Sequence, residues 1–105
     1  MKFYGLWYTH FNAGKVQGDG MAVLRDGEIL GGDPAHTYVG SYTTDGPELY
    51  LNVRVSPYAG HVPADLERPI DFVLWGSADG DSAKVAGCAN HHRELKAVVE
   101  LHRAA

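Results

Sequence analysis

The chain has 105 residues, 13 of them glycine, and a formal net charge of −4 at neutral pH. This length suits one domain with a modest hydrophobic core, so we expect a single domain over residues 1–105. The 45% hydrophobic content together with many glycines favours a turn-rich β protein over a helical bundle. The sequence has no basic stripe, which argues against direct binding of nucleic acid.

Cysteine usage and hydropathy bear on the cellular compartment. The single cysteine, Cys88, excludes a disulfide within the chain and is typical of a cytosolic protein. The N-terminal residues are too polar for a signal peptide. No apolar stretch approaches the roughly 18 residues of a membrane-spanning helix. We therefore expect a cytoplasmic protein without a membrane span.

Turn signals divide the chain into short apolar segments. Asp26-Gly27 is a strong hairpin signal, because a two-residue turn of this kind needs positive φ at both positions. Asp45-Gly46-Pro47 is a second break, and Gly31-Gly32 indicates a bulge or a tight corner where a barrel bends. The strands that we expect between the breaks lie at residues 3–10, 19–25, 28–32, 37–43, 48–56, 70–77, 83–89 and 94–102.

Alternation within these segments supports a sheet with one buried face. The segment 48–56 places aliphatic residues on one face and larger or polar ones on the other: Leu49, Leu51, Val53 and Val55 against Tyr50, Asn52 and Arg54. The last segment fits a strand by alternation and a helix by composition, and we favour the strand because a closed sheet needs its last strand to meet its first. Residues 57–69 contain three prolines and cannot form one ladder strand. The pattern predicts an all-β fold, an antiparallel up-and-down β-barrel of about eight strands.

Residues with catalytic or metal-binding chemistry show no recognisable spacing. Cys88 is followed by His91, but a nucleophilic thiol needs a nearby base and a lowered pKa, so a half-buried strand residue is the better interpretation. Asp79 and Asp81 resemble the opening of a calcium loop that lacks its required Gly and Glu, so a hairpin turn is the better interpretation. We expect no catalytic residue, no metal and no cofactor. An enzyme would require at least two histidines to converge on a cleft with a carboxylate or Cys88; the histidines are His10, His36, His61, His91, His92 and His102.

Trp7 and Tyr38 are aromatic residues that could line a cavity inside such a barrel. They could also fill the core or lie in a dimer face, which we favour, because an eight-stranded barrel is only just wide enough for either arrangement. A ligand-binding barrel predicts a real cavity and few large inward side chains. An interaction protein predicts a filled or narrow lumen and a large apolar dimer face.

One family resemblance rests on glycines and aromatic residues in the first half of the chain. It covers about the first 58 residues and is carried by Gly31-Gly32-Asp33-x-Ala35-x-x-Tyr38-x-Gly40, by Leu51-Asn52-Val53 and Tyr58, and by compatible runs at residues 4–8 and 18–24. These residues resemble the GrlR-type regulators, which are small negative regulators of bacterial type III secretion. The triplet Gly5-Leu6-Trp7 also looks like the Gly-x-Trp of lipocalin first strands.

The resemblance implies a lipocalin-like, eight-stranded barrel that forms a homodimer. The family member with an assigned role binds and sequesters a transcriptional activator, using an acidic loop between the fourth and fifth strands. The matching stretch here is Thr44, Asp45, Gly46, Pro47 and Glu48, in which Asp45 and Glu48 keep the charge and Gly46-Pro47 interrupts the acidic run. The resemblance therefore implies a non-enzymatic regulator that acts by protein–protein contact. A small-molecule or lipid-binding barrel is the alternative.

Overall fold

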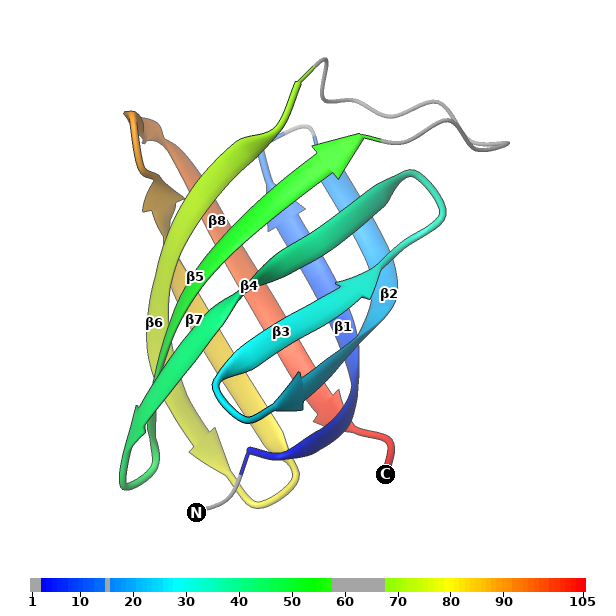
Figure 1. Ribbon diagram of the computed structural model, residues 1–105. Helices are drawn as coiled ribbons and strands as arrows, with labels where there is room; N and C mark the ends of the chain where they lie inside the picture. Colours follow the sequence, from blue (N-terminus) through cyan, green and yellow to red (C-terminus); the bar gives the residue numbers. More distant parts are fainter. Residues whose placement is uncertain (1–2, 15, 58–67) are drawn as a thin grey trace.

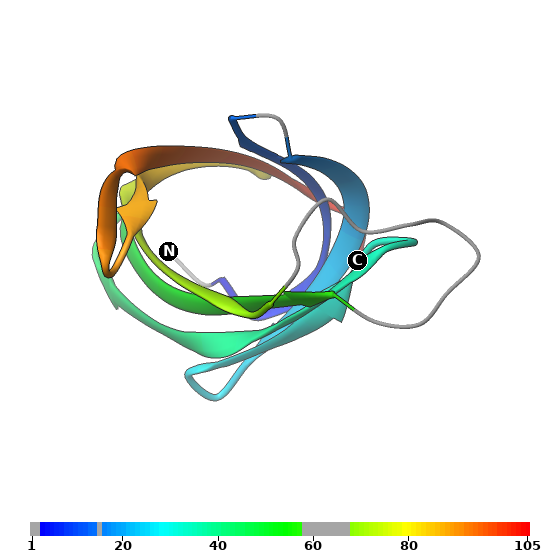
Figure 2. The same ribbon diagram turned by 90° about the horizontal axis from the view of Figure 1, so that it is seen from above.

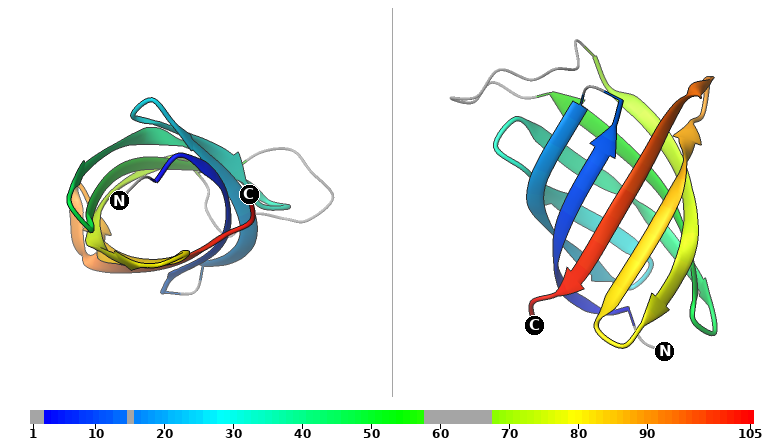
Figure 3. Two further views of the ribbon diagram at one scale, coloured as in Figure 1. Left: turned by 90° about the horizontal axis from the view of Figure 1, so that it is seen from below. Right: turned by 180° about the vertical axis from the view of Figure 1, so that it is seen from behind.

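The computed structural model describes residues 3–14, 16–57 and 68–105, and these form a closed antiparallel barrel (Figure 1). Each strand pairs with the next in chain order, and the last pairs back with the first, so the predicted up-and-down architecture is confirmed. The views from above and below show a ring of strands, and β7, β8 and β1 lie side by side at the back (Figures 2 and 3). The strands are β1 (Gly5–Ala13), β2 (Val16–Arg25), β3 (Glu28–Gly32), β4 (His36–Asp45), β5 (Glu48–Pro57), β6 (Ile70–Asp79), β7 (Ser82–Ala89) and β8 (His92–Arg103).

Tight hairpins join most neighbouring strands. Asp26 and Gly27 adopt φ of 51° and 80°, as the predicted two-residue turn between β2 and β3 requires. At the corner that follows, a Cβ on Gly31 would overlap the carbonyl oxygen of Met21. The predicted corner at Gly31 is therefore a close backbone approach that a larger residue would block.

The first two strands are longer than predicted. Residues 11–18 lie between the predicted strands 3–10 and 19–25, but Gly14 at φ 64° turns the chain tightly enough for Ala13 to pair with Val16. The last segment is a strand, as predicted, and β8 is hydrogen-bonded to both β7 and β1. An irregularity between Cys88 and Ala89 shifts the register of β7 against β8, which extends β8 back to His92.

The core lies inside the barrel and is made by every second residue of each strand. Phe11 of β1 meets Phe72 of β6 edge-to-face with 5.4 Å between ring centroids, and it lies 6.2 Å from the ring of Tyr38 of β4. The aliphatic face predicted for β5 points inward, with Leu49 and Leu51 buried. Large side chains from several strands therefore meet in the middle of the lumen.

One end of the barrel is closed by residues from both ends of the chain. Phe3, just before β1, stacks on Trp7 with 6.3 Å between ring centroids, and its carbonyl oxygen accepts a 2.9 Å hydrogen bond from Trp7 Nε1. The Arg103 guanidinium lies 4.3 Å from the centroid of the Trp7 ring and donates to the carbonyl oxygen of Tyr4 at 2.7 Å. The N-terminal segment passes across this end of the ring (Figure 3, left). We call these four residues the closed mouth.

The two tryptophans provide a matched test of this closure. Trp7 is 0% exposed and Trp75 is 59% exposed. We expect Trp7→Ala to lower the free energy of unfolding by about 3–5 kcal/mol, because it removes a fully buried aromatic side chain. Trp75→Ala should lower it by less than about 1 kcal/mol, since an exposed cross-strand aromatic pair contributes no more than that. Urea unfolding of both variants checks the prediction, and equal losses would contradict the assigned role of the closed mouth.

Candidate interaction surface

The barrel interior leaves little room for a ligand. Its cavity has a volume of about 40 Å³, whereas pockets for drug-sized ligands measure roughly 300 Å³ or more. Tyr38 lines this cavity, and Trp7 lies in the closed mouth instead. The lining residues are Thr9, Phe11, Ala22, Leu24, Ile29, Tyr38, Leu51, Val53, Val55, Phe72, Leu74, Val99 and Leu101.

A buried polar cluster at the end opposite the closed mouth fixes Tyr38. Its hydroxyl donates to the Asp33 carboxylate, which also accepts hydrogen bonds from the backbone N–H groups of Ala35 and His36, both at 2.8 Å. His36 Nδ1 donates to the same carboxylate at 2.9 Å. A Cβ on Gly18 would overlap the Asp33 carboxylate, so the neighbouring strand leaves just enough space for this group. The cluster locks the turn between β3 and β4.

Burial and the Asp33 carboxylate raise the pKa of the Tyr38 hydroxyl far above its ordinary range. The hydroxyl is therefore protonated at neutral pH and donates to the Asp33 carboxylate. His36 is 2% exposed, and its Nε2 has no hydrogen-bond partner among the described residues. The side-chain hydrogen bonds that the structure shows for Asp33, His36 and Tyr38 are all made within the cluster, which indicates a structural role.

The predicted acidic loop forms the hairpin between β4 and β5. Asp45 pairs with Glu48 across a two-residue turn in which Gly46 has φ 59°. The carbonyl oxygen of Pro47 accepts a 2.9 Å hydrogen bond from the backbone N–H of Ala78, which ties the hairpin to β6. Asp45 is exposed and Glu48 is half-buried. The loop is therefore a clamped turn that presents Asp45 outward.

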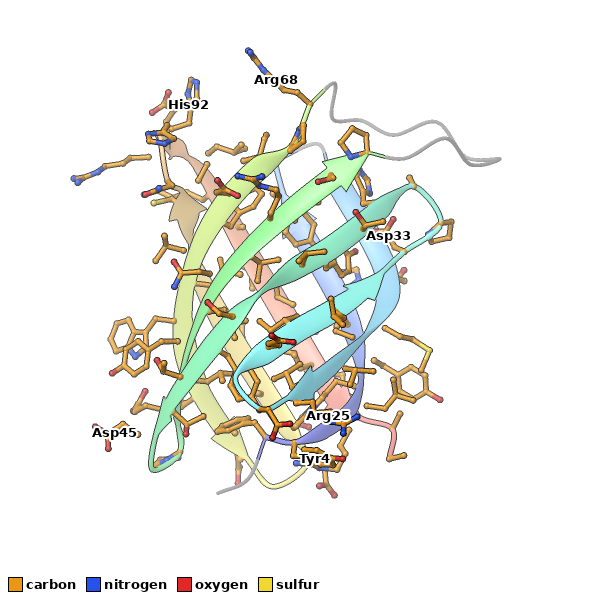
Figure 4. The ribbon with its side chains drawn as sticks, viewed as in Figure 1. Tyr4, Arg25, Asp33, Asp45, Arg68 and His92 are labelled. Carbon is orange, nitrogen blue, oxygen red and sulfur yellow. The ribbon has the colours of Figure 1, made fainter. Side chains whose placement is uncertain are left out.

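Two further acidic hairpins lie at the same end of the barrel. Up-and-down topology brings the β2–β3, β4–β5 and β6–β7 turns to the end where the closed mouth lies (Figure 1). Figure 4 places Asp45 and Arg25 at this end, and Arg68 and His92 at the other. We call this carboxylate-rich rim the acidic end; it comprises Asp26, Glu28, Asp45, Glu48, Asp79 and Asp81.

The acidic end is only partly neutralised. Arg25 lies 3.6 Å from the Asp26 carboxylate, and Arg103 lies 3.1 Å from that of Asp81. Asp45, Glu48 and Asp79 form no ion pair within the part of the chain that the structure describes. This end of the barrel therefore presents exposed negative charge.

Two parallel aromatic rings stand on the outer wall beside the acidic hairpin. Tyr50 of β5 is paired with Trp75 of β6, and the rings lie 6.3 Å apart at an interplanar angle of 9°. They are 41% and 59% exposed. Trp75 Nε1 donates to Glu48 Oε2 at 3.2 Å, which connects the aromatic pair to the acidic end.

A row of aliphatic side chains crosses another part of the outer wall. Val23, Leu30 and Val39 are paired across β2, β3 and β4. They are 42%, 55% and 52% exposed. We call these three residues the outer aliphatic row; they place exposed apolar side chains next to one another on neighbouring strands.

Two pairs of described histidines line open surface hollows beside a carboxylate, His10 and His102 with Asp19 and His91 and His92 with Asp71. His10 pairs in register with Glu100 and lies 2.5 Å from the Asp19 carboxylate, whereas His102 pairs with Tyr8. His61 lies outside the described residues. In residues 3–14, 16–57 and 68–105, no three side chains of His, Cys, Asp or Glu are grouped to hold a metal ion.

The remaining candidate groups lie in strands and turns. Cys88 is a half-buried residue of β7 with a free thiol, as predicted. Asp79 and Asp81 belong to the predicted hairpin, in which Gly80 has φ 64°. His91 and His92 line an open surface hollow of about 540 Å³ together with Arg68.

The described residues contain no helix long and apolar enough to cross a membrane.

Comparison with known proteins adds no identification. No family model matches this sequence, and no curated protein matches it. The outer surface must therefore be interpreted from its own chemistry.

The aromatic pair and the wider acidic end were missed by sequence reasoning. Alternation already places Tyr50 opposite the inward face of β5, which was the available signal. The pairing of Tyr50 with Trp75 depends on the register across residues 57–69, which no local pattern fixes.

The raised pKa of Tyr38 predicts a loss of stability at alkaline pH. Above pH of about 10 the unfolded chain ionises Tyr38 while the folded chain holds its proton, so stability falls by about 1.4 kcal/mol per pH unit relative to Tyr38→Phe. The stabilisation is fully present below pH of about 10 and is lost as the pH rises toward the raised folded value. Urea unfolding from pH 9 upward checks this, with exposed Tyr8→Phe as the control; parallel curves for wild type and Tyr38→Phe would contradict it.

Proposed function

We propose that this protein is a non-enzymatic regulatory protein that acts in the cytoplasm by binding another protein, in the manner of the GrlR-type regulators that it resembles. The observation that carries the proposal is the nearly filled lumen, whose cavity measures about 40 Å³. A small-molecule or lipid carrier needs an interior chamber several times larger. Recognition therefore uses the outer surface.

The acidic end supports a basic protein partner, for which a transcriptional activator is the family precedent. In the loop at residues 44–48, Gly46 and Pro47 interrupt the acidic run between Asp45 and Glu48. The fold sets two more acidic hairpins beside it, so Asp26 and Asp79 contribute charge at the same end. Rim charges of this kind steer a partner of opposite sign and fix its orientation.

The outer aliphatic row supports self-association. Val23, Leu30 and Val39 expose aliphatic surface from three paired strands, and their flank at Arg54 and Asp71 is already neutralised by a 2.8 Å ion pair. A two-fold dimer would bury the same row from both subunits. We therefore assign the row to a homodimer contact and leave the acidic end free for the partner.

Charge removal at the acidic end should abolish partner capture. In a pull-down from native cell lysate, we expect immobilised Asp45→Asn/Asp79→Asn protein to recover at least about tenfold less of a specific partner than immobilised wild type. The reason is that neither carboxylate forms an ion pair with a described residue, so both charges are available to the partner. Raising the salt concentration should weaken the wild-type capture in the same way. Asp19→Asn/Glu100→Gln removes equal charge from the β2 and β8 wall and serves as the control.

Two outcomes would contradict this assignment. One is capture of the same partner in equal amount by the Asp45→Asn/Asp79→Asn bait. The other is an equal loss with the control bait, which would show that total charge, not the acidic end, determines binding.

The dimer assignment is tested by sedimentation. Wild type should sediment at twice the mass of one chain at micromolar concentration, and Leu30→Arg should sediment as a monomer because it places a charge within the apolar contact. Ala86→Arg, which alters an exposed residue of β7 on another part of the wall, should remain a dimer. A monomeric wild type, or dissociation by both variants, would contradict the assigned face.

A further inference from the structure

The aromatic pair carries chemistry that the acidic end alone does not have. Tyr50 and Trp75 are parallel within 9° and together present two exposed ring faces on the wall of the barrel. The Trp75 indole is held by Glu48 Oε2 at 3.2 Å, and Glu48 Oε1 has no hydrogen-bond partner among the described residues. An oriented ring face thus lies beside an available carboxylate oxygen.

We propose that Tyr50, Trp75 and Glu48 form a platform that binds an arginine side chain of the partner's basic segment. A guanidinium is planar and weakly hydrated, so it stacks on an aromatic face and donates N–H groups to a carboxylate at the ring edge. Asp45 pairs with Glu48 across the hairpin and adds an uncompensated charge beside the platform. The inference rests on the proposed function and names the partner group that this surface recognises.

The choice of arginine follows from the combination of groups. A lysine ammonium can pair with Glu48 as a point charge, but it cannot stack a flat face on Trp75. A neutral apolar segment would leave the Glu48 and Asp45 carboxylates without a partner and partly desolvated. The outer aliphatic row consists of Val23, Leu30 and Val39 and offers no aromatic face, which makes it the less suitable site for a guanidinium.

The inference is tested by NMR titration with two short peptides, Ac-Gly-Arg-Gly-Arg-Gly-NH2 and its lysine counterpart, at 0.15 M salt. The reporters are the two indole N–H signals. The Trp75 signal reports binding at the platform, and the Trp7 signal reports the fold because that indole is buried and bonded to Phe3. The variants Tyr50→Ala and Glu48→Gln each alter the platform but retain both tryptophans, so both indole N–H signals can still be followed.

We expect a saturable shift of the Trp75 signal and an affinity for the arginine peptide about three- to fivefold above that for the lysine peptide. Tyr50→Ala and Glu48→Gln should each weaken binding of the arginine peptide about threefold or more, with the Trp7 signal unchanged. Tyr8→Ala, which removes an exposed tyrosine of β1, should leave the affinity unchanged.

Equal affinities for the two peptides, a Trp75 signal that does not shift, or wild-type affinity in Tyr50→Ala would each overturn the inference. The two proposals fail separately. If partner capture depends on Asp45 and Asp79 but the two peptides bind with equal affinity, only the arginine platform is ruled out. If the arginine peptide binds more tightly at Trp75 but partner capture does not depend on Asp45 and Asp79, only the role of the acidic end is ruled out.

Discussion

The packing of inward side chains across the lumen is the constraint on which the rest of the structure depends. Eight strands enclose a space that side chains can only just fill, and here Phe11, Phe72 and Tyr38 meet within it. Trp7 and Arg103 then close one end by bringing the first and last strands together. The closed sheet therefore has no free edge and almost no interior space, and its outward side chains and turns form the accessible surface.

The same topology determines how the outer surface is divided. The turns at residues 26–27, 46–47 and 80–81 gather at one end, because every second connection of an up-and-down barrel returns there. This places the acidic hairpins next to one another, and cross-strand register places Tyr50 and Trp75 beside them. At the other end, the buried Asp33 carboxylate fixes the β3–β4 turn through donors from its own loop and from Tyr38. The exposed carboxylates and the buried polar cluster thus lie at opposite ends of the barrel.

Local patterns were sufficient to predict most of the strands. The alternation of residues 48–56 and the positive φ required at Asp26-Gly27 depend on nearest neighbours, and both were confirmed. The length of β1 and β2 was not predicted, because a polar run around Gly14 resembles a loop when its pairing is unknown. The polar cluster of Asp33, His36 and Tyr38 was also missed, since burial of a carboxylate depends on donors that only the folded chain brings together.

Native mass spectrometry of freshly purified protein tests the central claim, that the lumen is packed and the protein acts through its outer surface. We expect a species with no added mass beyond the protein chains, since a cavity of about 40 Å³ has no room for a lipid or a cofactor. A reproducible small-molecule adduct that survives gentle desolvation and is lost on unfolding would contradict it, because such a ligand would require an interior chamber that this packing does not provide.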